Sequence, residues 1–273
     1  MTRMSAVMLA VLCVVPVAAE QPPPLRILEG SSTAVTIGND AFSVKVDSTG
    51  RLSNLQAGGI EYVSFVAMYS SPTSFETGKG VRAVQGETGE ARGIGPIPEK
   101  IAAEQRGERY VVNIKRTAER QEICGGAPLY DLHQTVEVAP NGTVNLRYEF
   151  AWRRFFDPGS PTIYVALAGP TFTGLSYWAD HSDNCIKGEF TEGANYTKYE
   201  GLSGSMRSMR AETPAGPFNL RIDTSNGIVS TRWGEQYCAI GLQVLRGLVY
   251  PGISSKVEFT IRVPVKDAGQ GED

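Results

Sequence analysis

Histidine and cysteine are scarce in this sequence, and the common catalytic and metal-binding motifs are missing. The 273 residues include only two histidines and four cysteines. No two cysteines form a C-x-x-C pair, which argues against a zinc site. The chain also lacks G-x-S-x-G, H-E-x-x-H and a phosphate-binding glycine loop. Serine-based hydrolysis is therefore unsupported, and we expect no cofactor and no metal.

Clustered positive charge is also lacking. The chain carries 26 basic and 29 acidic residues, a formal net charge of -3, and it has no long lysine or arginine run. A protein that binds nucleic acid normally presents a basic surface, so we expect no nucleic-acid partner. The hydrophobic fraction of 41% and the charged fraction of 20% are typical of a globular protein that buries its own core.

Long apolar runs are absent except at the N-terminus. Arg3 precedes the apolar stretch "SAVMLAVLCVVPV", and the small residues "VAA" end at Ala19. This order predicts a secretory signal peptide over residues 1–19 and a mature chain that begins at Glu20. The run is too short for a stable membrane span, although an uncleaved anchor is the alternative. We therefore expect an exported protein, periplasmic or extracellular, without a membrane span after cleavage.

Cleavage would leave three cysteines in an oxidising compartment, enough for at most one intramolecular disulfide. Cys238 lies in "QYCAIGLQVL", in phase with apolar neighbours, which predicts a buried strand thiol. Cys124 and Cys185 lie beside loop residues. We expect these two to form the disulfide, although spacing alone cannot fix the connectivity.

Glycine and proline are plentiful, with 30 and 16 residues, and helix signals are nearly absent. Alternating runs joined by turn residues recur along the chain, which predicts antiparallel strands. The strongest is "HQTVEVAPNGTVNLRYEF", with its turn at Asn141-Gly142, and "PFNLRIDTSNGIVSTRW" suggests a second hairpin at Asn226-Gly227. Only residues 98–107 could form a short helix. The fold class we predict is all-β, a large antiparallel β-sandwich.

No composition break demands a second domain. We assign residues 20–33 to a proline-rich lead-in, 34–265 to a single β-sandwich and 266–273 to a flexible tail. We expect a monomer.

Three stretches together resemble galactose-mutarotase-like domains. "FSVKVDSTGRLSNLQAGGIEYV" is similar to their opening strands, "HQTVEVAPNGTVNLRYEF" to their middle hairpin, and "LVYPGISSKVEFTIRVP" to their closing strand after a Pro-Gly turn. The resemblance spans most of the mature chain, but it consists of strand and turn patterns. It implies the supersandwich fold of aldose epimerases, of the closing domain of large β-galactosidases and of domains in polysaccharide-degrading enzymes. It also implies a sugar bound on the concave sheet.

The sequence departs from an aldose epimerase where that family keeps its chemistry. The resemblance would give the role of base to Glu258, on the closing strand. The histidine acid of the family stands in an "H-x-Y-F" segment, but the corresponding stretch here is "ALAGPTF", without an imidazole. The family's early Asn-Arg pair has no clear counterpart either. We therefore expect no aldose 1-epimerase activity.

The segment "SYWADHSDNC" is the densest cluster of candidate binding groups. Trp178 offers an aromatic face for the apolar side of a pyranose, and Asp180 and His181 offer hydrogen-bonding groups for hydroxyls. The alternative is a polar loop held by Cys185. His133 lies on the polar face of its strand, where it either lines the cleft or is an ordinary surface residue.

Arg154 and Trp233 complete the candidate substrate-binding residues, because each belongs to an Arg-Trp or Arg-Phe neighbourhood. Arginine beside aromatic rings suits an acidic sugar, whose carboxylate pairs with the guanidinium, or plain packing at a strand end. We predict an exported carbohydrate-binding protein whose partner is a sugar or polysaccharide. One alternative is an enzyme of the same fold, an epimerase or a polysaccharide lyase, using His133 or His181. The other is a structural envelope protein that has lost the cleft.

Overall fold

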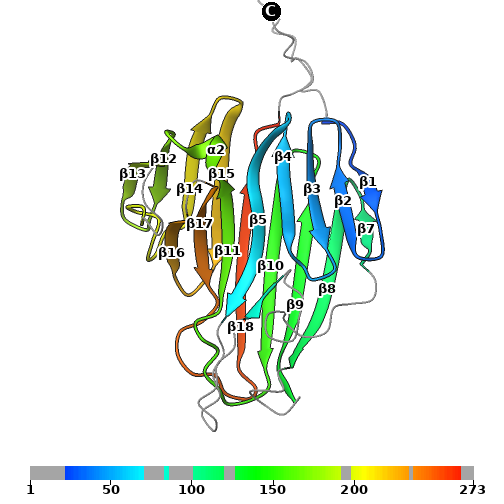
Figure 1. Cartoon of the computed structure of the whole chain (residues 1–273), viewed down its shortest axis with the longest axis vertical. Helices are drawn as coiled ribbons and strands as arrows, with labels where there is room; N and C mark the ends of the chain where they lie inside the picture. Colours follow the sequence, from blue (N-terminus) through cyan, green and yellow to red (C-terminus); the bar gives the residue numbers. More distant parts are fainter. Residues whose placement is uncertain are drawn as a thin grey trace, which may run out of the picture.

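The computed structural model describes residues 22–70, 83–85, 101–119, 127–191, 198–233 and 236–265. These residues form two antiparallel sheets, and the predicted all-β sandwich is confirmed (Figure 1). The predicted signal peptide, the predicted tail over 266–273 and Cys124 lie outside the described residues. The one described helix is the four-residue α2 (Gly169–Phe172), so no described helix has the length and hydropathy needed to cross a membrane.

The first sheet, which we call the front sheet, has the strand order β1-β2-β3-β4-β5-β11-β17-β16, with β6 beside β5. All five residues of its outermost strand, β1, are exposed, and the strand lies within the segment 20–33 that the sequence suggested as a lead-in. The strands are β1 (Arg26–Gly30), β2 (Ala34–Gly38), β3 (Phe42–Asp47), β4 (Leu52–Ala57), β5 (Ile60–Ser70), β6 (Ala83–Val84), β11 (Thr162–Ala168), β16 (Ile228–Trp233) and β17 (Tyr237–Gln243).

The second sheet, which we call the site sheet, has the order β13-β12-β14-β15-β18-β10-β9-β8-β7. The closing strand of the sequence is central in it, because β18 pairs with both β10 and β15. The strands are β7 (Ala103–Arg106), β8 (Arg109–Glu119), β9 (Pro128–Val138), β10 (Thr143–Trp152), β12 (Ser176–Asp180), β13 (Cys185–Glu189), β14 (Ser208–Thr213), β15 (Gly216–Thr224) and β18 (Ser254–Arg262).

The hairpin at Asn141-Gly142 forms as predicted. Gly142 has φ +75°, a conformation that glycine adopts without strain, and Ala139 donates its N–H to the carbonyl of Thr143 at 2.9 Å. The turn fixes the register of β9 and β10, so that His133 lies opposite Glu149. This pairing matters below, because both side chains belong to the candidate site.

The second predicted hairpin, at Asn226-Gly227, is wrong. β15 belongs to the site sheet and β16 to the front sheet, so this segment crosses from one sheet to the other. Asn226 donates its backbone N–H to the carbonyl of Gln243, and Gln243 donates its own to Gly227, both at 2.9 Å. The Asn-Gly pair therefore bonds to the end of β17, because the turn residues permit a reversal without choosing the partner strand.

The short helix predicted over residues 98–107 is also wrong for its described part. Ala103–Arg106 is β7, an edge strand that pairs with the start of β8 around Gly107, whose φ is +62°. Residues 98–100 lie outside the described residues. Helix propensity in "AAEQR" is a weak preference, and pairing with the strongly strand-forming "RYVVNI" overrides it.

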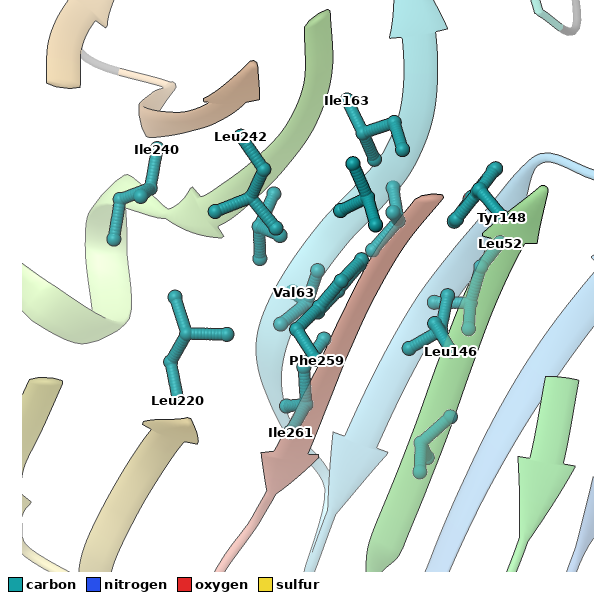
Figure 2. Close-up of a cluster of buried hydrophobic side chains, with 14 of the residues drawn as sticks. Leu52, Val63, Leu146, Tyr148, Ile163, Leu220, Ile240, Leu242, Phe259 and Ile261 are labelled. Atoms are coloured by element: carbon teal, nitrogen blue, oxygen red, sulfur yellow. The ribbon is translucent and has the colours of Figure 1, made fainter. Parts of the chain in front are cut away.

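The core lies between the two sheets and follows the two-residue alternation of the strands. On β18, Val257, Phe259 and Ile261 are at most 1% exposed, as the closing stretch predicted. Phe259 stacks on Tyr148 of β10, with ring centroids 6.3 Å apart. Figure 2 shows Phe259, Ile261 and Tyr148 among apolar residues of the front sheet, including Val63. Burial of this surface removes apolar area from water and supplies the main favourable contribution to folding.

A polar cluster lies inside the core. It is centred on Gln134, the residue after His133 on β9. Gln134 is fully buried; it donates to the carbonyl of Gly50 at 2.7 Å and to the hydroxyl of Tyr148 at 3.0 Å. It also accepts a hydrogen bond from Gln85 at 2.7 Å. These bonds tie the β3–β4 turn of the front sheet to β9 and β10 of the site sheet.

Candidate functional site

The outer face of the site sheet, turned away from the front sheet, is covered with polar side chains. Along β9, β10 and β18 the apolar residues point into the core, so every second residue points outward. Antiparallel pairing brings the outward residues of neighbouring strands into rows. One row runs Lys115, His133, Glu149 and Lys256 across β8, β9, β10 and β18.

A hollow of about 480 Å³ lies on this face around His133. Its volume is in the range of small-molecule sites. The residues that line it come from β8, β9, β10 and the start of β18, and the outward ones are Lys115, Thr117, Asp131, His133, Glu149, Ala151 and Ser254. A second hollow of about 500 Å³ shares Thr117 and Asp131 with the first and is also lined by Glu119, Pro128, Arg153 and Arg154. We call the two together the His133 hollow.

His133 and Glu149 form a histidine–carboxylate pair in the hollow. The His133 Nδ1 lies 3.5 Å from Glu149 Oε2. The other ring nitrogen, Nε2, is buried and has no hydrogen-bond partner within the described part of the chain. Glu149 also pairs with Arg147, two residues before it on β10. The hollow therefore contains a histidine whose orientation is supported by a carboxylate and whose second nitrogen has an unmet hydrogen bond, which costs free energy.

Asp131 fixes the end of the hollow that lies near the start of β9 and the end of β10. It accepts a hydrogen bond from the Thr117 hydroxyl at 2.9 Å, and the Arg153 Nε donates to its other carboxylate oxygen at 2.7 Å. Arg153 adds a second bond from its terminal nitrogen to the same oxygen, so two N–H groups of the guanidinium hold one carboxylate oxygen. These hydrogen bonds between Arg153 and Asp131 fix the chain just after β10, where Arg154 lines the hollow.

Charge is balanced in the hollow. The outward cationic groups are Lys115, Arg153 and Arg154, and the outward acidic groups are Glu119, Asp131 and Glu149. These three cationic and three acidic groups balance one another. A site of this kind offers many hydrogen-bond donors and acceptors without a net field, which suits a neutral polyhydroxylated ligand better than a charged one.

Glu258, the residue that the family resemblance would use as base, lies outward near the hollow but is engaged by two cations. Lys256 Nζ lies 2.6 Å from its Oε1, and Arg147 Nε lies 3.5 Å from the same atom. The stretch corresponding to the family's histidine runs through α2, where Phe172 is buried and no imidazole is present.

Trp178 and Asp180 lie on the same outer face, but at its far edge. Between β12 and β9 there are five strand spacings, roughly 24 Å, before any offset along the strands. Trp178 is partly buried and lies beneath Lys187, whose Nζ is 5.4 Å from the ring centroid. Asp180 accepts a hydrogen bond from Ser208 at 2.7 Å, and this bond together with one from Cys185 lowers the pKa of its carboxyl.

The remaining predicted site residues lie elsewhere. His181 is in the turn between β12 and β13, with its Nε2 2.9 Å from the carbonyl oxygen of Gly201. Trp233 ends β16 at the edge of the front sheet, so it does not share a sheet with the others. Of the six predicted residues, the hollow brings together only His133 and Arg154.

The cysteines are only partly described. Cys238 is buried as predicted, and burial raises the pKa of its thiol above the usual range. Cys185 is a free, exposed thiol, and its hydrogen bond to Asp180 raises its pKa. Cys124 lies outside the described residues, and the predicted Cys124–Cys185 disulfide is not seen in the structure, where Cys185 is a free thiol. Within the described ranges, no three His, Cys, Asp or Glu side chains gather as metal ligands would.

Sequence reasoning missed Lys115, Thr117, Asp131 and Glu149. A signal for Glu149 was available, because a hairpin centred on Asn141 pairs residues whose numbers are equally far from 141. His133 and Glu149 are both eight positions away. Asp131 and Thr117 required the pairing of β8 with β9, and the sequence does not fix that register.

Comparison with known proteins identifies the fold. The Slr1438 protein of Synechocystis sp. PCC 6803 matches with a TM-score of 0.55 at 10% identity, covering 96% of this chain and 100% of that one. YeaD of Salmonella typhimurium, a proposed mutarotase, matches with 0.52 at 11% identity, covering 92% and 97%. Galactose 1-epimerase of Lactobacillus acidophilus NCFM matches with 0.51 at 10% identity, covering 89% and 98%.

The chain therefore has the galactose-mutarotase-like β-sandwich fold that its opening and closing strands predicted. No protein-family model matches the sequence, and no curated protein matches it. Identities of 10–11% establish the fold alone, since one fold supports many activities. Function has to be argued from the site.

Proposed function

We propose that this protein is an exported monomer that binds a neutral carbohydrate in the His133 hollow. The observation that carries the proposal is the composition of the hollow: hydroxyl, carboxylate, guanidinium, ammonium and imidazole groups of balanced charge line two adjoining cavities of about 480 and 500 Å³ on one sheet face. Each sugar hydroxyl can donate and accept a hydrogen bond, so it finds partners in such a set. The fold supports the same conclusion, because similar structures include a galactose 1-epimerase.

Binding without anomer interconversion is the activity that the side chains support best. Glu258 is paired with Lys256 and Arg147 through Oε1, so one of its two carboxylate oxygens is already engaged. His133 and Glu149 are neighbours in one row, so they act from the same side of a ligand. Epimerisation of a ring needs an acid and a base that serve two different oxygens, and that arrangement is not provided by one adjacent pair.

A second candidate is an enzyme that uses this pair, because a carboxylate oxygen of Glu149 lies 3.5 Å from the His133 Nδ1, on the side of the ring from which it can orient the imidazole. Polarimetry on freshly dissolved galactose and glucose separates the two candidates. We expect mutarotation at the spontaneous rate. Protein-dependent mutarotation that disappears in Glu149→Gln would replace the binding function with the enzymatic one.

The binding test is a glycan array of the mature protein followed by isothermal titration calorimetry with the sugars that bind. We expect His133→Ala to weaken binding about fivefold, since a hydrogen bond contributes about 1 kcal/mol net. Thr135→Ala is the matched control: Thr135 is two residues away on the same face of β9 and does not line the hollow. Trp178→Ala, at the far edge of the sheet, should have no effect.

If Trp178→Ala weakens binding and His133→Ala does not, the ligand occupies the β12 edge and the proposed location is wrong. If no glycan on the array binds, carbohydrate binding itself is rejected. The structural envelope function would then be the remaining alternative.

A further inference from the structure

Two exposed aromatic side chains lie in segments that adjoin the His133 hollow in sequence, and the site described above does not use them. Phe155 is 49% and Tyr250 is 51% exposed, and their ring centroids are 5.0 Å apart with planes at 37°. We call this pair the aromatic platform. Leu248 and Ile253, at 44% and 43%, are also exposed nearby in sequence. Four of the six large apolar side chains exposed among the described residues thus lie in these two short segments.

Backbone bonds place the platform at the end of the hollow. Phe156 and Val249 form an isolated antiparallel bridge, which holds the segment after β10 beside the segment before β18. Trp152 donates its N–H to the carbonyl of Ile253 at 3.0 Å. In Figure 1 these are the green and orange loops below the ends of β10 and β18.

The platform and the hollow are continuous along the chain. Arg154 lines the hollow and Phe155 is the next residue. Ser254 lines it from the other side, one residue after Ile253. The hydrogen bond from Arg153 to Asp131 fixes the start of this segment, so the backbone that carries the Phe155 ring is anchored.

We infer that the ligand is a neutral oligosaccharide whose chain leaves the His133 hollow and stacks a further sugar unit on the Phe155–Tyr250 platform. This inference rests on the proposed function and extends it from a single sugar to a polymer. An aromatic face packs against the apolar C–H face of a pyranose, while the polar hollow bonds the hydroxyls of the neighbouring unit. Stacking of a sugar unit would account for the exposure of two aromatic rings next to a hydrogen-bonding hollow.

The test is calorimetric titration of the mature protein with β-1,4-linked galactose and glucose oligosaccharides of one to six units, and with their uronic acid counterparts. We expect wild-type affinity for a neutral series to rise about five- to tenfold from one unit to the longer chains, and then to level off. Phe155→Ala and Tyr250→Ala should abolish the rise while the affinity for one unit stays as in wild type. Tyr250→Phe should retain the rise, because the ring is kept.

Leu28→Ala is the matched control, an exposed apolar residue on β1 at 39% exposure. Because both platform residues are about half exposed, the variants should melt like wild type, so lost affinity cannot be ascribed to unfolding. Equal affinity for all chain lengths in wild type would overturn this inference and leave the proposed function standing. A preference for the uronic acid series would show that the ligand is acidic. It would overturn the neutral ligand assumed in the proposed function and in this inference.

Failure of the wild type to bind any of these sugars would reject the proposed function and this inference with it. A wild-type dimer in light scattering that Tyr250→Ala converts to a monomer would also overturn the inference. In that outcome the platform is the contact between two copies of the chain.

Discussion

Replacement of Gln134 by leucine should destabilise the protein although it adds apolar surface to the core. Gln134 is fully buried between the sheets, and its amide donates to the Gly50 carbonyl at 2.7 Å and to the Tyr148 hydroxyl at 3.0 Å. Its oxygen accepts from Gln85 at 2.7 Å. Gln85 retains its bond to Thr49, at 2.8 Å, but the other two partners would lose the bond described for them.

The size of the effect follows from those two partners. A buried polar group left without a hydrogen bond costs about 1–3 kcal/mol, so two of them cost roughly 2–6 kcal/mol. Burial of the added apolar surface of leucine returns about 1–2 kcal/mol. The midpoints of the two ranges leave a net loss of about 2.5 kcal/mol in the free energy of unfolding of Gln134→Leu, within limits of roughly 0 to 5 kcal/mol. For a chain of this size, the midpoint value should lower the melting temperature by roughly 5–10 °C.

Urea unfolding followed by tryptophan fluorescence measures this directly, with the midpoint lowered and the slope unchanged. Thr135→Val is the control, because Thr135 is the next residue on β9 but points outward, where its hydroxyl donates to Asn113 at 3.1 Å. We expect its free energy of unfolding to change by less than about 0.5 kcal/mol. If Gln134→Leu unfolds at the same urea concentration as wild type, the buried cluster does not hold the two sheets together as argued.

Three further predictions concern the β12–β13 hairpin and the N-terminus. Gly188→Ala should lower the free energy of unfolding by about 1–3 kcal/mol, because its Cβ would lie 2.2 Å from the ring of Tyr177; an unchanged urea midpoint would contradict this. In reduced protein at pH 8, Asp180→Asn should speed alkylation of Cys185 by iodoacetamide. Loss of the carboxylate lowers the raised pKa of the thiol and so increases the thiolate fraction. Peptide mass spectrometry measures the alkylation rate, and a slower rate would refute the stated cause. N-terminal sequencing of the native protein should begin at Glu20, and an intact Met1 would exclude the predicted cleavage.

The lowered pKa of Asp180 gives the hairpin a pH dependence of known sign. A carboxyl whose pKa is depressed in the folded state stabilises that state above its unfolded pKa, and this contribution is lost as pH falls through the folded value. The effect is small, since the group is largely exposed and solvent screens it. It therefore acts on the hairpin edge and leaves the His133 hollow unaffected.

Local pattern predicted the strands well. Alternation marked Val257, Phe259 and Ile261 as one buried face, and the structure buries all three. The turn at Asn141-Gly142 specified a hairpin and its register, since a two-strand pairing with a short turn depends only on neighbouring residues. The same local information supported the resemblance to galactose-mutarotase-like domains, whose fold the structure has.

The candidate site could be predicted only in part, because its residues come from strands that are paired over long distances. His133 and Arg154 were chosen for their chemistry, and they do line the hollow. Trp178 and Asp180 were grouped with them, but a sheet places β12 five strands from β9. Neither the chemical type of two residues nor their separation in sequence fixes which strands become neighbours in a sheet.

The sequence alone determined which residues alternate, which side of each strand is buried and where the chain can turn, because these follow from the two-residue period and from backbone preferences at glycine, asparagine and proline. Only the tertiary structure decided that the Asn226-Gly227 segment crosses between sheets, and that Phe155 meets Tyr250 at the end of the hollow. The physical reason is that these contacts depend on the burial of two whole sheet faces against each other, which no local segment encodes.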